Sequence, residues 1–516
     1  MRIFDWLKGV FNSMFSPSTI QEVLKVTPAI STEMQSAIEL WERMYADESP
    51  WLSGSVKSLG LAAEIASEKA RMATLEMDVK LTGDSERAKF LQEPFMEMAS
   101  SIRKELEYGI ALGSLVIKPY VTETVDNKYK IDFTYVPANE FYPLSFAPNG
   151  DITEAAFIDR IVTQDYIYSK VERHKLYNNT VTVDNYAFKK GANASGGYQN
   201  DNELGVSIPL NSVPEWSLIV PHVDIENMDT LLFAYFKMPQ ANNIDMKSPL
   251  GVSGFSRAVS LIEDADKQYS NLLWEFEGGQ MAVDVDRTCF NYMKKNSEDV
   301  PILPELQERL YRRTLDLGDG EAYHVFAPSL RDSSILNGLN NILIQIENAC
   351  DLSRGTISAV NFTEARTATE LKILKQKSYA ANADIQKALE KTMRKVLVVM
   401  DKYCDMYEIN SKGDYEVSFC WDDSIIIDKD AERQIDLLDV EKGLMSKKEY
   451  RIKWYGDTEN QAEEALKDIE GEKKKEMELV QSMAPQNANG ELQKKQTDLQ
   501  RANESNKVLN SGEKNV

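Results

Sequence analysis

The spacing of apolar residues predicts three long helices between residues 254 and 407. From 254 to 277 apolar residues recur at every seventh position, and a narrow heptad stripe of this kind indicates packing against one or two other long helices. A second apolar pattern begins near Ser333 and fades near Gly355, and a third runs from Thr367 to about Tyr407. The heptad positions are Phe255, Ile262, Tyr269 and Phe276, with Ala258, Ala265 and Leu272 three places after the first three.

Start and stop signals support these helices. Gly278 and Gly279 follow the first pattern and predict its end. Thr367 and Glu370 form a capping box, in which the Thr hydroxyl and the Glu carboxylate each accept a hydrogen bond from a backbone N–H at the helix start. At about 1.5 Å per residue, the first helix is expected to be about 36 Å long and the third about 60 Å.

The first half of the chain changes from helical to strand-like periodicity. Residues 1–118 are predicted to be mainly helical, whereas apolar and polar residues alternate in short runs from Ser114 to about Pro221. The alternation predicts an antiparallel sheet set into a helical protein, so the expected fold class is α+β, mainly α. The helical patterns are Ile38, Trp41, Met44 and Tyr45, then Leu61 to Val79, then Phe95 to Leu112 ending at Gly113; the predicted strands are 115–121, 129–136, 155–163, 174–188 and 216–223.

A compact insertion of about fifty residues separates the first two long helices. It is predicted to contain strands over 281–293, a short helix over 304–314 and a turn-rich stretch over 317–326. Basic residues gather in it, and they are interpreted either as contacts with DNA phosphates or an acidic partner, or as ordinary solvated charge beside Glu298, Glu305 and Glu308. These basic residues are Lys294, Lys295, Arg309, Arg312 and Arg313.

The C-terminal part is predicted to be a strand over 415–421 followed by short acidic helices. Gly443 ends one helix, and the next two begin with capping boxes at Ser446–Glu449 and Thr458–Gln461. After about Met483 apolar residues become rare, which predicts a disordered tail.

The first fifteen residues form an amphipathic segment with Ile3, Phe4 and Phe11 on one face. This segment either anchors to a membrane surface or docks on protein, and the second interpretation is favoured because its polar face has no stripe of Lys and Arg. No membrane-spanning helix is expected, because no apolar run reaches about 18 residues. No signal peptide is expected either, because Asp5 and Lys8 interrupt the first apolar stretch and no small-residue cleavage site follows it.

Composition limits the partners. The 516 residues include 82 acidic and 59 basic side chains, for a formal charge of -23. Such a chain does not bind nucleic acid through broad phosphate neutralisation, although DNA could pass it without being held. The four cysteines, Cys289, Cys350, Cys404 and Cys420, are far apart, so we expect buried reduced thiols, in a reducing cytoplasm, rather than disulfides or a zinc site.

Signals for catalysis are weak. The G-x-x-x-x-G-K-[ST] and G-x-S-x-G patterns are absent, and His174, His222 and His324 are isolated, so each is expected to be structural or exposed. Paired carboxylates at Asp284 and Asp286, or at Asp422 and Asp423, would suit Mg²⁺ in a nuclease, but pairs arise by chance in so acidic a chain. Residues 316–321 resemble part of a calcium loop, yet the 12-residue ligand spacing fails. We therefore expect a protein without catalytic activity, cofactor or metal.

The order of these parts resembles portal proteins, the head-to-tail connectors of tailed double-stranded-DNA bacteriophages, and most of all those of long-tailed phages of Gram-positive hosts. The resemblance lies in the ordered set of stretches rather than in any one of them, and it covers most of residues 30–475. The stretches are 248–277, 335–358, 365–380 and 421–470.

The resemblance implies a fold with wing, stem, clip, tunnel loop and crown, assembled as a closed ring of usually twelve subunits. It assigns 1–245 to the wing, 246–280 and 334–359 to stem helices, 281–333 to the clip, 360–366 to the tunnel loop, 367–427 to a long wing helix and strand, 428–475 to the crown and 476–516 to the tail.

The implied function is a portal at one capsid vertex that conducts double-stranded DNA during packaging and ejection and nucleates head assembly. The implied partners are the terminase large subunit, the head-completion adaptor, the major capsid protein and the scaffolding protein, with no membrane. The protein would lie in the virion after assembly in the host cytoplasm. The tunnel-loop residues would be Asn361, Phe362, Thr363, Glu364 and Arg366, although Phe362 could instead anchor the loop on the helices. The alternatives are another capsid-associated or scaffolding protein without a channel, and the metal-dependent nuclease.

Overall fold

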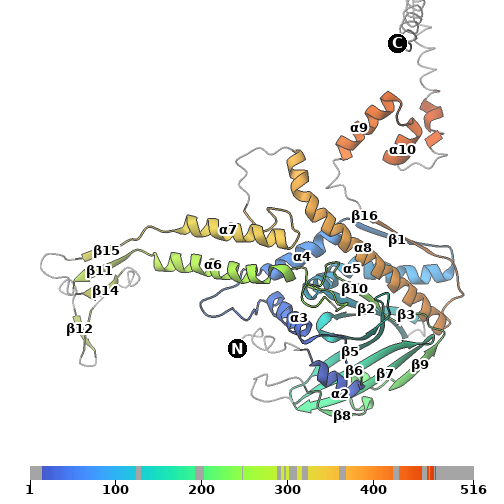
Figure 1. Ribbon diagram of the computed structural model, residues 1–516, viewed down its shortest axis with the longest axis horizontal. Coiled ribbons are helices and arrows are strands. Elements are labelled where there is room, and N and C mark those ends of the chain that lie inside the picture. Colours follow the sequence, from blue (N-terminus) through green and yellow to red (C-terminus); the bar gives the residue numbers. More distant parts are fainter. Residues whose placement is uncertain are drawn as a thin grey trace, which may run out of the picture. The chain divides into compact units, whose positions relative to one another are not determined.

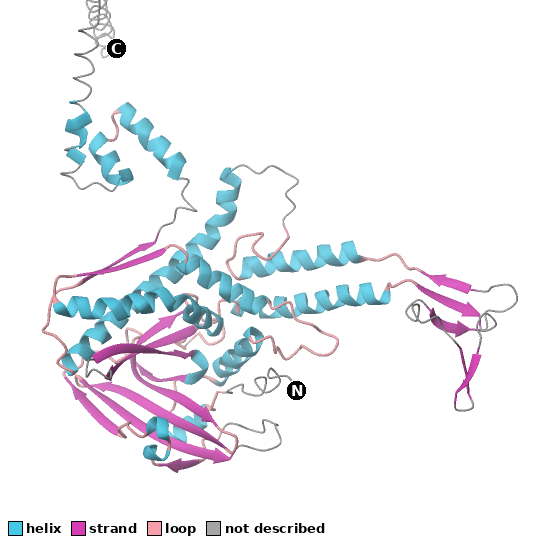
Figure 2. Cartoon of the chain, turned by 180° about the vertical axis from the view of Figure 1, so that it is seen from behind, coloured by secondary structure: helices cyan, strands magenta, loops and turns pink. Residues whose placement is uncertain are grey.

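The computed structural model of the protein describes residues 14–123, 129–191, 203–246, 248–286, 292–295, 298–301, 311–315, 323–359, 368–421, 429–455, 462–463, 465–469 and 471. The chain divides into two compact units, Met1–Ile426 and Ile427–Val516. Helices and sheets both occur, with more residues in helices than in strands, which confirms the mixed fold class (Figure 1 and Figure 2). Within the described residues no helix is long and apolar enough to cross a membrane.

The described part of the first unit, Met1–Ile426, starts with four helices. They are α2 (Pro17–Leu24), α3 (Thr32–Tyr45), α4 (Leu61–Thr74) and α5 (Glu86–Leu112). The predicted face of α3 is confirmed, because Ile38, Trp41 and Met44 are buried. The helix predicted over Leu61–Val79 is too long. It ends at Thr74, and Val79 lies in strand β1 (Met77–Thr82), whose alternating burial matches a strand.

Two antiparallel sheets confirm the β-rich region. One has the order β10-β2-β3, from Ala234–Lys237, Ser114–Glu123 and Tyr129–Pro137. The other has the order β4-β5-β6-β7-β8, from Phe141–Phe146, Ile152–Val162, Tyr166–Tyr177, Thr180–Gly191 and Val206–Ile208, and β9 (His222–Glu226) also pairs with β7. Short 3₁₀ turns lie at η1 (Ala138–Glu140), η2 (Leu210–Ser212), η3 (Pro214–Trp216) and η4 (Ser256–Ala258). The strand predicted over 216–223 is therefore wrong for most of its length, because Trp216 ends a turn and buries its ring in a small separate core.

A close crossing fixes where the first long helix begins. The helix α6 spans Val259–Gly278, so its predicted start at 254 is five residues early. Residues 248–255 instead cross the end of α5, where Gly254 N donates to Ile110 O at 2.8 Å. A Cβ on Gly251 would lie 2.0 Å from Gly113 O, and Gly113 itself has φ +89°. Only glycine fits this contact, so the crossing displaces the helix start.

The insertion contains more strand than the sequence predicts. Strands β11 (Ala282–Asp286), β14 (Tyr311–Leu315) and β15 (Tyr323–Phe326) form one sheet, and β12 (Tyr292–Lys295) pairs with β13 (Glu298–Pro301). The short helix predicted over 304–314 is wrong at its end, because Tyr311–Leu315 pairs in parallel with β11. Its residues 304–310 lie outside the described part.

The chain returns through α7 (Asp332–Ala349) and continues in α8 (Ala368–Met406) and β16 (Glu416–Trp421). The prediction that α7 begins near Ser333 is confirmed, but the helix ends at Ala349 rather than near residue 355 or 359. The middle of α8 is in the core, with Leu389, Met393 and Met400 buried, and β16 pairs antiparallel with β1. The Thr367 cap lies outside the described residues.

The second unit contains α9 (Lys429–Lys442) and α10 (Lys447–Tyr455). The capping box at the start of α10 is confirmed: Glu449 N donates to Ser446 Oγ at 3.1 Å, and Ser446 N donates to Glu449 Oε2 at 2.8 Å. Gly443, at φ +74°, follows α9 as predicted. The predicted cap at 458–461, the tail after 476 and the segment before residue 14 lie outside the described part.

Candidate functional site

Two long helices, α6 and α7, lie side by side and are joined at the end where the insertion begins (Figure 1 and Figure 2). Arg331, just before α7, holds Glu275 near the end of α6: its backbone N donates to Oε1 at 2.9 Å and its Nη2 donates to Oε2 at 2.8 Å. These hydrogen bonds hold the pKa of Glu275 below its ordinary value. The Glu275–Arg331 pair therefore holds together the segment that enters the insertion and the segment that leaves it.

At the other end of α7, the buried carboxylate of Glu347 organises the chain that leaves the helix. Its Oε1 accepts hydrogen bonds from the backbone N–H groups of Gly355, Ile357 and Ser358 at 3.0, 2.8 and 2.9 Å. Its Oε2 accepts one from Ser358 Oγ at 2.8 Å. Glu347 is 1% exposed. One side chain therefore accepts hydrogen bonds from three backbone N–H groups within four residues, although Gly355 N also donates to Ser358 Oγ at 3.3 Å.

A second side chain continues this contact along α7. Asn340 Oδ1 accepts from Ala359 N at 2.7 Å, and Asn340 Nδ2 donates to Ala359 O at 3.2 Å. Because Asn340 precedes Glu347 by two helical turns, residues 355–359 run back along α7. We call Glu347, Asn340 and the residues 355–359 that they hold the return clamp.

The helix that follows is tied to the same place. Lys377, in the third turn of α8, donates from Nζ to Asn348 O at 2.6 Å and lies 2.9 Å from Asp351 Oδ1. The return clamp fixes residue 359 and Lys377 fixes the early part of α8. The segment 360–367 is thus bounded on both sides by contacts with α7. Asn361, Phe362, Thr363, Glu364 and Arg366, the residues predicted for the tunnel loop, lie within it and outside the described residues.

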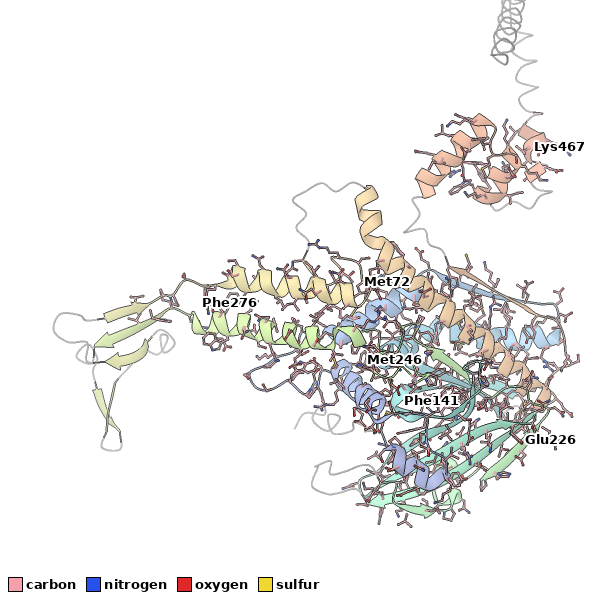
Figure 3. The ribbon with its side chains drawn as sticks, in the orientation of Figure 1. Met72, Phe141, Glu226, Met246, Phe276 and Lys467 are labelled. Atoms are coloured by element: carbon pink, nitrogen blue, oxygen red, sulfur yellow. The ribbon has the colours of Figure 1, made fainter. Side chains whose placement is uncertain are left out.

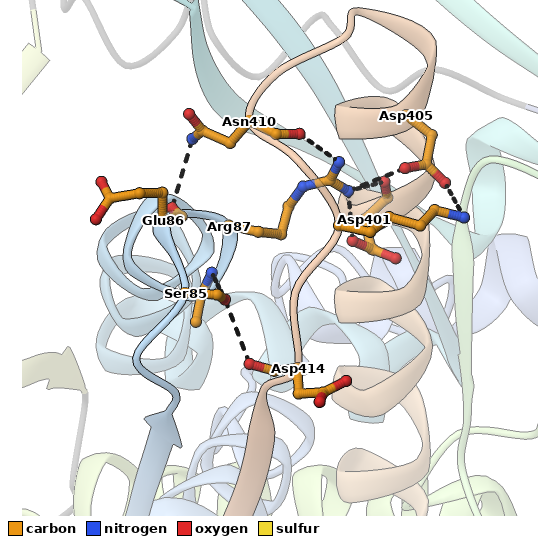
Figure 4. Close-up of polar contacts among 9 residues, drawn as sticks. Ser85, Glu86, Arg87, Asp401, Asp405, Asn410 and Asp414 are labelled. Atoms are coloured by element: carbon orange, nitrogen blue, oxygen red, sulfur yellow. Dashed lines mark hydrogen bonds and ion pairs between the residues drawn. The ribbon is translucent and has the colours of Figure 1, made fainter.

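The far end of α8 is held by a buried arginine (Figure 4). Arg87, on α5, is 2% exposed and donates from Nη1 to Asp401 Oδ1 at 2.7 Å and to Asp405 Oδ1 at 3.1 Å. Its Nη2 donates to the carbonyl of Asn410 at 2.8 Å. Both ends of α8 are therefore attached to neighbouring helices by charged groups.

The structure does not bring the predicted basic residues of the insertion into one strand or sheet. Lys294 and Lys295 lie on β12, where their register partners are Asp299 and Glu298. Arg312 and Arg313 lie on β14 in the other small sheet, and Arg313 is the register partner of Asp284. Arg309 lies outside the described residues. Acidic residues opposite the basic ones reduce the net charge of each of these strand pairs.

Among the described residues, no group of three or more His, Cys, Asp or Glu side chains could hold a metal ion. Asp284 and Asp286 lie on β11, and Asp422 and Asp423 lie outside the described part. His174 is buried beside Glu172, and His222 is exposed beside Asp184.

The cysteines partly match the prediction. Cys350 and Cys404 are buried free thiols, and burial raises the pKa of each to about 12. Cys420 is exposed on β16, contrary to the expectation that the thiols are buried. Cys289 lies outside the described residues.

The return clamp was not predicted from the sequence. Glu347 lies in an apolar helical pattern where a glutamate is ordinarily a surface residue, and its partners follow eight to eleven residues later without a recognisable turn motif. Only the polar residue within the buried face of that pattern could have pointed to it.

Comparisons with known proteins give one family. The model of the family described as "Phage portal protein, SPP1 Gp6-like" matches residues 58–479. Among solved structures, a chain in "Neck of native GTA particle computed with C12 symmetry" is similar at 10% identity and a TM-score of 0.37, over 85% of this chain and 98% of that one. A search of curated proteins finds no match.

Proposed function

This chain belongs to the phage portal protein family of the SPP1 Gp6-like kind, and on that premise we propose that its copies form a closed ring at one capsid vertex through which double-stranded DNA is packaged and ejected. Members of the family are structural components of phage particles rather than enzymes. The ring, of about twelve copies in this proposal, also nucleates the head and contacts the major capsid and scaffolding proteins.

Each part of the chain has a role in the proposal. The helices α6 and α7 form the stem, and the sheets of the insertion form the clip, where the terminase large subunit and later the head-completion adaptor dock. The wing consists of the sheets outside the insertion together with α2–α5 and α8. Residues 360–366 form the tunnel loop beside DNA, and residues 428–475 form the crown. The net charge of -23 supports passage of DNA, because few tight phosphate contacts would oppose sliding.

Exposed apolar residues on the stem are the observation that carries the proposal of self-assembly. On α6, Leu272 is 7% exposed, but Trp274 is 65% exposed and the heptad residue Phe276 is 44% exposed (Figure 3). On α7, Leu336 is 45% exposed. Two large apolar side chains near the end of α6, one on the heptad stripe and one beside it, therefore remain uncovered by α7. Apolar surface of this kind marks a protein interface, and in a ring the covering partner is a second copy.

Charge on this surface is expected to prevent ring formation. In a Trp274→Glu, Phe276→Glu double variant, the carboxylates would be desolvated between subunits, so the ring population should fall at least about tenfold at micromolar concentration. Mass photometry measures it, and circular dichroism should show an unchanged fold.

The matched control is Leu218→Glu, which changes an apolar residue that is 95% exposed in the wing and should leave assembly intact. Rings that persist in the double variant would show that this stem surface is not the interface. Negative-stain images of the wild-type ring should show a central channel, and a solid particle would instead favour a scaffolding protein.

Charge reversal in the clip is expected to separate docking from assembly. Changing Arg309, Arg312 and Arg313 to Glu should weaken binding of the terminase large subunit about tenfold or more, since close like charges oppose association. Ring formation, measured by mass photometry, should not change. Reversal of Lys104 and Lys387, which are exposed in the wing, provides the control. Collapse of the ring would instead place the three arginines between subunits.

A further inference from the structure

A cavity of about 640 Å³ lies within the wing, between its two sheets. One wall is a face of the larger sheet. The register places Glu172 of β6 opposite Phe157 of β5 and Asn185 of β7, and His174 two positions along β6 shares their face. Lys118 and Thr134, register partners on β2 and β3, belong to the opposite wall. Tyr403 and Tyr407, at the end of α8, close one side, and β9, which ends at Glu226 (Figure 3), borders another.

A buried histidine in this cavity presents an acceptor that has no partner. His174 Nε2 lies 2.6 Å from Glu172 Oε1, and the side chain is 5% exposed. Burial opposes ionisation of Glu172, yet the Lys118 ammonium and the hydrogen bond from His174 hold its pKa well below the ordinary value. The carboxylate is therefore an acceptor, so His174 donates from Nε2. Burial lowers the pKa of His174, which leaves Nδ1 as an unprotonated acceptor, buried and without a hydrogen bond.

A second acceptor without a partner lies on the neighbouring strand. Asn185 donates from Nδ2 to Val220 O at 3.0 Å, which orients its amide, and its buried Oδ1 has no partner. Buried acceptors are almost always satisfied, so two on one sheet face indicate a missing donor. Burial of each acceptor atom without a hydrogen bond is unfavourable, and a bound molecule that donates to it would remove that cost.

The other lining side chains limit what that molecule can be. Phe157, Val183, Ile225, Tyr403 and Met406 make most of the lining apolar or aromatic, and water there would forgo hydrogen bonds. A strong anion would face Asp159 and Glu172, and a strong cation would face Lys118 and Lys170. The volume lies within the range of about 300–1,000 Å³ typical of ligand pockets.

We propose that this cavity binds a small, neutral aromatic molecule that donates N–H or O–H hydrogen bonds to His174 Nδ1 and Asn185 Oδ1. The ring system packs against the aromatic and aliphatic side chains between the sheets. The two polar acceptors select molecules with donors over methylated analogues of the same shape. The proposal concerns the wing of each subunit and holds whether or not DNA passes through the ring.

Matched pairs of probes test the donor requirement. Indole and 1-methylindole, and benzamide and N,N-dimethylbenzamide, are compared on the purified full-length protein by saturation-transfer NMR and calorimetry. The donor-bearing member of each pair should bind about tenfold tighter, because the methylated analogue leaves an acceptor unpaired. In Asn185→Leu this preference should shrink to about threefold or less. Equal affinities within both pairs for the wild-type protein would overturn the proposal.

A second pair of variants tests the location. Val223 lines the cavity and is 36% exposed on β9, a strand that pairs on one side only, so Val223→Trp should fill the cavity without unfolding the sheet. It should abolish probe binding. Leu218→Trp, at a residue that is 95% exposed and not part of the lining, should bind the probes as the wild-type protein does. Unchanged binding in folded Val223→Trp would place the probes elsewhere and refute the assignment.

Discussion

Loss of the Glu347 carboxylate is expected to release residues 355–359 and to abolish DNA packaging while the ring still forms. In Glu347→Leu, four hydrogen bonds at 2.8–3.0 Å disappear together. Hydrogen bonds to charged groups contribute about 1.5–3 kcal/mol each and are not additive, so we expect the segment to lose about 3 kcal/mol of local stability. Amide exchange at Gly355, Ile357 and Ser358 should then accelerate about 100-fold.

The control is Glu347→Gln, whose carbonyl can accept the same three N–H groups while its amide donates to Ser358 Oγ. It should retain slow exchange and most packaging activity. Two results would contradict different parts of the argument. Slow exchange in Glu347→Leu would show that the carboxylate does not hold the segment. Fast exchange with normal DNA filling would show that the position of residues 360–366 does not matter for packaging, contrary to their assignment as a tunnel loop.

Removal of the Arg87 guanidinium is expected to destabilise the wing. In Arg87→Met the stem of the side chain remains but Asp401, Asp405 and the carbonyl of Asn410 lose their partner. Breaking a buried ion pair costs about 3–5 kcal/mol, and because the two aspartates are 26% and 31% exposed, water can compensate for part of it. We expect a loss of about 2–4 kcal/mol, measured as a lower Tm by circular dichroism.

The matched control is Lys89→Met on the same helix, which removes an exposed ion pair with Glu86 and should leave the Tm nearly unchanged. The pH dependence gives a second check. Burial opposes ionisation of Asp405, but hydrogen bonds from Lys412 and Arg87 hold its pKa below the ordinary value. Because the pKa of Asp405 is lower in the folded than in the unfolded protein, its ionised carboxylate adds to the free energy of unfolding above about pH 4. This contribution is lost as the pH falls through the folded-state pKa. The gap between wild type and Arg87→Met should therefore narrow in acid, and equal Tm values at neutral pH would refute the role of Arg87.

The long helices were predictable because their information is local. Apolar periodicity, at heptad spacing for α6, identified α6, α7 and α8 to within a few residues at most ends, and the Ser446–Glu449 motif located the start of α10. The two larger errors, at the start of α6 and the end of α7, occur beside tertiary contacts. The crossing at Gly251 delays the start of α6, and the return clamp follows an α7 that ends at Ala349 although its apolar pattern continues.

Features that depend on distant pairing were not predictable. The strand β1 follows α4 so closely that Val79 fitted the helical period, and its partner β16 is far along the chain. Arg87 is one of many charged residues until α8 places two aspartates beside it. The cavity needs side chains from β2, β5, β6, β7, β9 and α8, so no single stretch of sequence carries its pattern. The predicted tunnel-loop and clip residues remain predictions.

The pairing of Met77–Thr82 with Glu416–Trp421 has a consequence for biosynthesis. At translation rates of about 5–20 residues per second, the early strand emerges from the ribosome roughly 15–70 s before its partner exists. Until then its open edges and the apolar side chains Val79 and Leu81 lack their native cover, so the nascent polypeptide depends on chaperones or on delayed compaction. Any association of subunits that requires this pairing must wait until synthesis has passed Trp421, so chains truncated before that residue lack the completed sheet.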